Sequence, residues 1–247
     1  MNFRHVLILC CFCFPVFGTR FINVDPEREN FSPYLYVANQ PLTAIDPDGK
    51  NAKVVVDEKA QTITVSAKIV VWGDAADEKT AKMMEKNINA AWNGHVYEDT
   101  DKNKTYNVVF DVKVLYEKER PTNYKEKAKR NPELNYVELR KEFRRSETFG
   151  NGFEGIWKGN DQVSPENDPA PHEFGHLIGL DDKYTSTAPF KGWDGNIMGM
   201  PAMMGVVEKK NIHMFLKPAM EKHHKNMTRL IPRKKTVYHI KPRNRFY

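Results

Sequence analysis

Apolar and polar residues alternate along two segments of this chain, and a segment with helical spacing lies between them. Every second residue is apolar in residues 62–71, and the same alternation runs through residues 106–116. This period of two predicts two β-strands, each with one buried face. Residues 77–94 instead place apolar side chains three and four positions apart, begin with acidic residues and end at a glycine, which predicts an amphipathic helix. We therefore expect a domain that mixes helices and strands.

Two other regions are dominated by charge. Residues 117–145 are highly charged, and we expect a partly helical, solvated surface there. The net charge of +6 is concentrated in a basic C-terminal tail, residues 207–247. This tail could bind nucleic acid, an anionic membrane or an acidic protein, but no nucleic-acid-binding motif accompanies it. We expect its histidines His213, His223 and His224 to lie on the surface.

The first 18 residues have the outline of a secretory signal peptide. Arg4 and His5 precede an apolar run from Val6 to Phe17, and Gly18 follows this run. The run is too short to cross a bilayer as a helix, so we expect a secreted protein with no transmembrane anchor. All three cysteines lie in this leader, so we expect no disulfide in the rest of the chain.

Residues 172–182 carry the motif with the most chemical information, H-E-x-x-H-x-x-G-x-x-D. Positions four apart lie on one face of a helix, so His172 and His176 can direct two imidazoles at one metal ion. Glu173 stands beside the first histidine, where a carboxylate can take a proton from a water molecule at the metal. Pro169 and Pro171, just before the motif, suit the start of a helix.

Gly179 and Asp182 complete the motif. Gly179 has no Cβ, so it can end the helix with a positive φ and turn the chain sharply. This turn would bring Asp182 back towards the ion as a third ligand. Three protein ligands and one water are typical of a catalytic zinc site rather than a structural one. The simplest alternative is a helix that carries two histidines and a glutamate by chance.

This motif and the segment Asp194-Gly195-Asn196-Ile197-Met198-Gly199-Met200 together resemble the metzincin metalloproteases. In that clan a methionine on a tight turn packs beneath the zinc-binding histidines, and the resemblance gives Met198 this role. Most members use a third histidine where this chain has Asp182, but the snapalysin-like members use aspartate. Members often carry a tyrosine two residues after the methionine. Met200 occupies that position here, so Tyr184 or another phenol would have to replace this tyrosine.

The resemblance implies an α+β fold of the zincin type, with a twisted mixed sheet, a long backing helix, an active-site helix and a small C-terminal subdomain. It places the active-site helix and the methionine turn within residues 170–200. It also implies that residues 149–163, rich in Gly, Trp and Phe, hold the edge strand along which an extended peptide binds. The implied protein is a zinc-dependent endopeptidase with Glu173 as general base and a protein or peptide as substrate.

Residues 19–50 resemble the end of the RHS-repeat core domain of polymorphic toxins. The resemblance rests on Arg20-Phe21 with Asp25-Pro26, on the segment 32–42, and on Asp46-Pro47-Asp48-Gly49. In such toxins this junction precedes a variable effector. The resemblance therefore implies that residues 51–247 are an effector domain with an immunity protein as partner. Residues 1–18 are then either a working signal or a leader fused to a displaced toxin cassette.

Two other functions are compatible with the sequence. The chain could be a non-catalytic binding module that zinc merely stabilises, but a structural zinc site has no need of a general base such as Glu173. It could also be a toxin domain that targets nucleic acid, and the basic tail is the only feature that supports this alternative.

Overall fold

The computed structural model describes residues 44–45, 52–131, 133–142, 145–149, 152–159, 168–185, 188–199, 205–227 and 236–240. The chain divides into two units between Pro41 and Leu42, and every described residue belongs to the second unit. The signal-like leader of residues 1–18 therefore lies outside the described residues. The same is true of the RHS-like segment, apart from residues 44–45.

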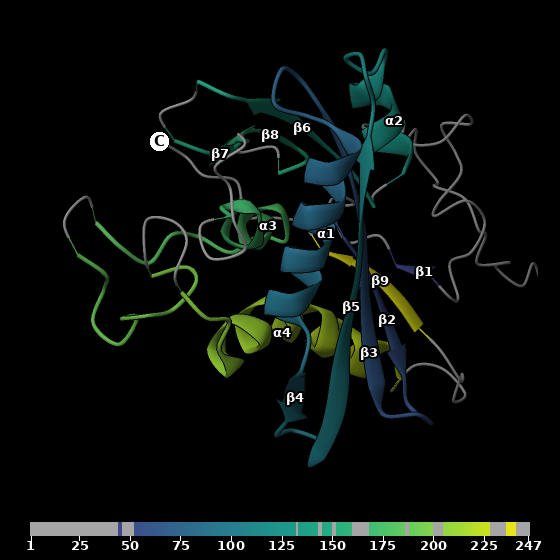
Figure 1. Ribbon diagram of the computed structural model, residues 1–247. Coiled ribbons are helices and arrows are strands. Elements are labelled where there is room, and N and C mark those ends of the chain that lie inside the picture. The colour runs from purple at the N-terminus through teal and green to yellow at the C-terminus, as the bar shows by residue number, and fades with distance from the viewer. Residues whose placement is uncertain are drawn as a thin grey trace, which may run out of the picture. The chain divides into compact units, whose positions relative to one another are not determined.

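A mixed β-sheet organises the described residues (Figure 1). Its strands follow the order β1-β9-β2-β3-β6-β8-β7, while β5 pairs with β3 and β4. Three pairs are parallel, namely β3 with β5, β3 with β6, and β6 with β8. Three further pairs are antiparallel, namely β2 with β3, β4 with β5, and β7 with β8. The strands are β1 (Ala44–Ile45), β2 (Ala52–Asp57), β3 (Thr62–Trp72), β4 (His95–Asp99), β5 (Lys104–Tyr116), β6 (Leu134–Arg140), β7 (Glu147–Thr148), β8 (Glu154–Lys158) and β9 (Thr236–Ile240).

Helices cover both faces of this sheet. Phe110 of β5 contacts the rings of Trp92, Phe174 and Phe215, which belong to three different helices, so these helices share one core. Val70 and Trp72 point to the opposite face, where they pack with a residue of the remaining helix. The helices are α1 (Glu78–Trp92), α2 (Tyr124–Arg130), α3 (Ala170–Leu177) and α4 (Lys209–Met227), and α2 is the one on the opposite face.

This arrangement is compatible with the α+β class and confirms a mixed sheet with a long helix packed against it. The strands predicted at residues 62–71 and 106–116 are β3 and β5, and the helix predicted at residues 77–94 is α1. The side chain of Asp77 accepts a 2.6 Å hydrogen bond from the backbone N–H of Thr80, which caps the start of α1.

Side chains of α1 seal the outer edge of β5. Asn89 accepts a hydrogen bond from the backbone N–H of Val112 and donates one to its carbonyl, and Asn93 does the same for Phe110. Four residues of helix rise about 6 Å and two residues of strand about 6.8 Å, so the two spacings nearly match. These asparagines of α1 thus take the place of a neighbouring strand. They occupy the backbone N–H and C=O groups of Val112 and Phe110, which are then not available to pair with a strand of another chain.

We expect the Asn89→Ala variant to be destabilised by about 1–3 kcal/mol, because it leaves two buried backbone groups of Val112 without partners. Urea unfolding of the variant and of wild type would measure the loss. Lys86→Ala, an exposed change on the same helix, is the matched control and should cost far less. Equal destabilisation by the two changes would show that Asn89 does not seal the strand.

The structure corrects two expectations about strands. Residues 117–145 contain a helix, as expected, but also β6, which lies between β3 and β8 and buries Tyr136, Val137 and Leu139. This strand was not predicted, because the charged residues on both sides of it give the whole segment the composition of a solvated surface. In the described part of residues 149–163 the strand is β8, which pairs with β6 on one side and β7 on the other, so β7 rather than β8 is the edge strand there.

The region expected to be a basic tail contains α4, which packs into the core. Ile212, Phe215 and Leu216 are buried, and the lysines of α4 lie on its other faces. The expectation of surface histidines is wrong for His223, which is buried beside Glu58, while His224 contacts Asp99. No helix in the described part of the chain is both long and apolar enough to cross a bilayer.

Candidate metal centre

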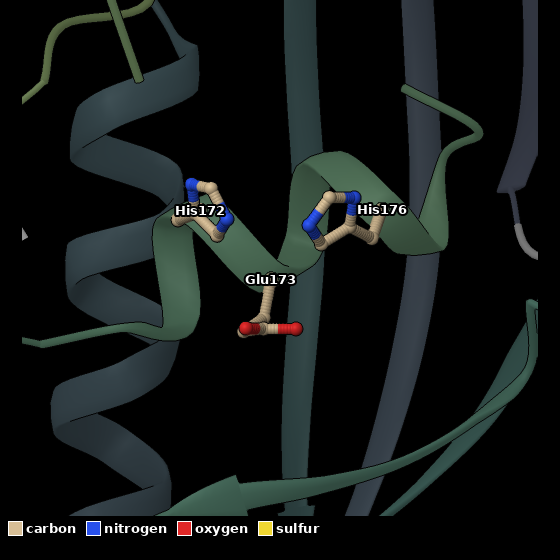
Figure 2. Close-up of side chains that lie close together, drawn as sticks. All are labelled: His172, Glu173 and His176. Atoms are coloured by element: carbon tan, nitrogen blue, oxygen red, sulfur yellow. The ribbon is translucent and has the colours of Figure 1, made fainter. Parts of the chain in front are cut away.

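The helix α3 carries the two histidines and the glutamate of the motif (Figure 2). Pro171 occupies its first turn, and the indole N–H of Trp92 donates a 2.9 Å hydrogen bond to the Pro171 carbonyl, which fixes the start of α3 against α1. His172, Glu173 and His176 are all buried, and their ligand atoms lie within 4.8 Å of one another. These three side chains form a buried group that could bind a metal ion.

Gly179 ends α3 and reverses the chain, as the sequence predicts. Its φ is +94°, its N–H donates to the carbonyl of His176, and the N–H of Leu180 donates to the carbonyl of Gly175. This pair of hydrogen bonds is the Schellman motif, in which glycine is favoured because a Cβ is strained at such a φ. The turn directs the following residues, including Asp182, back towards the histidines.

Asp182 reaches both histidines. Its Oδ1 atom lies 3.3 Å from Nε2 of His172 and 3.1 Å from Nε2 of His176. The other ring nitrogens face backbone carbonyls, since Nδ1 of His172 is 2.6 Å from the Ile197 oxygen and Nδ1 of His176 is 2.8 Å from the Leu180 oxygen. A carbonyl can only accept, so each Nδ1 carries a proton, and in the neutral form of either ring the lone pair of Nε2 faces Asp182.

When both rings are neutral, three acceptor atoms face one another here, and a cation between them removes their mutual repulsion. Asp182 Oδ1 is buried and has no hydrogen-bond partner of regular geometry. Zinc-to-nitrogen and zinc-to-oxygen bonds of about 2.0–2.1 Å in a tetrahedron separate neighbouring ligand atoms by about 3.3–3.4 Å. The separations of 3.1 and 3.3 Å between Asp182 Oδ1 and the two Nε2 atoms are close to this value, so the position of Asp182 is compatible with an ion of that size.

The pKa values of Asp182, His172 and Glu173 are all shifted by burial and by their mutual contacts. Burial would raise the pKa of Asp182, but the contacts with His172 and His176 outweigh burial and hold this pKa far below its usual range. Burial disfavours protonation of His172, yet the contact with Asp182 raises the pKa of this imidazole. Burial also raises the pKa of Glu173, against the opposing effect of both histidines, so its carboxylate is a stronger base than an exposed one.

Two contacts that the sequence did not predict support the carboxylates. Thr148 of β7 donates a 2.9 Å hydrogen bond to Oε2 of Glu173. The guanidinium of Arg145 lies 3.4 Å from Oδ2 of Asp182 and 2.6 Å from the hydroxyl oxygen of Tyr184. Burial raises the pKa of Tyr184 to about 12, so its hydroxyl remains protonated at neutral pH. Only the strand order brings Arg145 and Thr148 here, and no local motif marks them.

The turn that contains Met198 lies directly against α3. A Cβ added to Gly175 would be only 2.5 Å from the Met198 sulfur, so Met198 packs on the helix between the two histidines. The neighbouring carbonyl, that of Ile197, is the acceptor for His172. Three further methionines follow at positions 200, 203 and 204, and they lie outside the described residues.

A cavity of about 320 Å³ opens beside His172. It is lined by residues of α1, by the start of α3 and by the turn before Met198, and the buried carboxylate of Asp168 faces this space together with Asn87 and Ile197. Asn87 donates a 2.8 Å hydrogen bond to Asp168, and burial raises the pKa of this carboxyl.

Comparison of the chain with protein-family models and with curated proteins gives no match.

Proposed function

We propose that residues 51–247 form a zinc-dependent endopeptidase of the metzincin type. The observation that carries this proposal is the convergence of His172 Nε2, His176 Nε2 and Asp182 Oδ1, with the buried carboxylate of Glu173 one residue from the first histidine. The mixed sheet, the long helix α1 and the packing of Met198 under α3 support the same class. The RHS-like segment supports a role as a secreted toxin effector, with an immunity protein as partner.

Asp182, rather than Glu173, is the third ligand in this proposal. Glu173 belongs to the buried group by distance, but its carboxylate is held by Thr148, whereas Asp182 Oδ1 is directed at both Nε2 atoms. A zinc ion held by the three ligands would lower the pKa of water and polarise a peptide carbonyl. Glu173 then accepts the proton of the attacking water and returns it to the leaving amine.

Two other groups assist this chemistry. The Tyr184 hydroxyl is protonated at neutral pH and interacts with Asp182, and in this proposal it turns from Asp182 to donate a hydrogen bond to the oxyanion that forms on the peptide carbonyl. Arg145 holds the outer oxygen of Asp182, which directs Oδ1 inward and offsets the negative charge that aspartate adds compared with a third histidine.

The proposal is tested by incubating the purified, zinc-loaded chain with a peptide library, with and without a chelator. We expect cleavage that the chelator abolishes and that added zinc restores. A protein that holds one zinc per chain and cleaves no peptide would overturn the proposal and would favour the non-catalytic module. Hydrolysis of nucleic acid in place of peptides would favour the nucleic-acid-targeting alternative.

Replacement of Asp181 and of Asp182, one at a time, tests which of these two adjacent aspartates is the third zinc ligand. We expect Asp182→Ala to weaken zinc binding by more than about 100-fold, because even the loss of a residue that only orients a ligand costs 10–100-fold. Asp181→Ala should leave the affinity nearly unchanged, because Asp181 is exposed and follows the same turn. Competition with a chromogenic chelator measures both affinities, and the reverse ranking would contradict the proposed ligand set.

A further inference from the structure

We propose that Thr148 is a positioning residue for Glu173: its hydroxyl, oriented by the indole of Trp157, fixes one carboxylate oxygen and leaves the other to take the proton. This inference rests on the proposed function, since it assigns how the general base of that site is held. Three groups form the relay, from Trp157 of β8 to Thr148 of β7 to Glu173 of α3.

The direction of the relay follows from the donors available. Trp157 Nε1 lies 3.2 Å from Thr148 Oγ1, and an indole nitrogen can only donate. The threonine oxygen therefore accepts from Trp157, and its single hydrogen is left for another acceptor. Oε2 of Glu173 lies 2.9 Å away, whereas the backbone oxygen of Glu173 is more distant at 3.4 Å. The carboxylate is the better acceptor on distance and on charge.

Gly155 of β8 makes room in the sheet for the contact between Trp157 and Thr148. Thr148 pairs across the strands with Gly155, and Trp157 lies two residues further along β8, on the same face as Gly155. A Cβ on Gly155 would be 2.8 Å from the indole nitrogen and 2.9 Å from the Glu147 oxygen. Gly155 thus leaves the space through which the indole, itself fully buried, reaches the threonine.

The relay has a consequence for the reaction. Glu173 is 4% exposed, so water does little to hold its carboxylate in one orientation. The bond from Thr148 fixes Oε2 and leaves Oε1 outside the relay. Oε1 is therefore the oxygen that meets the attacking water. Catalytic groups need such placement, because an error of about 1 Å can cost 10²-fold in rate.

Thr148→Val and Thr148→Ser are the matched pair of variants that test the relay. Valine keeps the branched shape on β7 and removes the hydroxyl, whereas serine keeps the hydroxyl and removes the methyl group. With the zinc-loaded full chain and a cleaved peptide, we expect kcat to fall about 10–100-fold in Thr148→Val, with KM within about twofold of wild type. Thr148→Ser should retain most of the wild-type kcat, and both variants should bind zinc as wild type does.

A second readout does not depend on peptide cleavage. In ¹⁵N-labelled protein, the indole N–H resonance of Trp157, assigned with Trp157→Phe, should move upfield in Thr148→Val, which removes its acceptor, and stay near its place in Thr148→Ser. If no peptide is cleaved, the proposed function fails while this resonance still reports whether the relay exists. An unmoved resonance, an unchanged kcat in Thr148→Val, or a serine variant as slow as the valine variant would overturn the assignment.

Discussion

Replacement of Glu173 by glutamine should leave the chain folded and zinc-loaded, and should lower peptide hydrolysis by at least about 10²–10⁴-fold, the contribution typical of general acid–base catalysis. Glutamine has the same shape, and its amide oxygen can still accept the hydrogen bond from Thr148. The amide cannot take a proton from water at neutral pH. The loss therefore isolates proton transfer from the geometry of α3.

Initial rates on one cleaved peptide, together with zinc content, measure this effect. Glu119→Gln, a change of the same chemistry at an exposed position far from the motif in sequence, is the control and should keep wild-type rates. Undiminished hydrolysis by Glu173→Gln at equal zinc content would show that another group is the base. The buried Asp168, whose pKa burial also raises, would then be the first alternative near His172.

The sequence predicted the parts of the site that depend on local spacing. His172 and His176 share a helix face because they are four residues apart, and Gly179 turns the chain because only a residue without Cβ adopts its φ easily. These relations need no knowledge of the sheet. For the same reason β3, β5 and α1, each with a clear apolar period, could be predicted to within a few residues.

The parts that escaped prediction depend on contacts between distant segments. Thr148 reaches Glu173, and Trp157 reaches Thr148, only because β7 is the edge strand beside β8, and nothing in residues 145–158 marks the hydroxyl as the partner of a carboxylate. Likewise, His223 looked like a surface residue of a basic segment. Its burial follows from the packing of α4, which places Glu58 beside it.

Removal of His176 should abolish tight zinc binding. His176→Ala leaves His172 and Asp182 as two ligands, too few for the four-coordinate geometry that zinc prefers even with water added, and we expect a loss of affinity of more than about 100-fold. Zinc at 1,000 times its Kd stabilises a folded protein by about 4 kcal/mol, so added zinc should raise Tm clearly in wild type and scarcely in the variant.

The matched control for this experiment is His213→Ala. His213 is exposed and stacks on Tyr97 of β4, away from the motif in sequence, so its removal should leave both the zinc content and the zinc-dependent rise in Tm intact. Full zinc occupancy in His176→Ala would instead show that the zinc ion binds at a site other than α3. In the described part of the chain the other side chains close enough to hold an ion are Asp99, Asp101 and His224. Loss of zinc from His224→Ala but not from His176→Ala would then show that α3 carries a buried polar network and no metal centre.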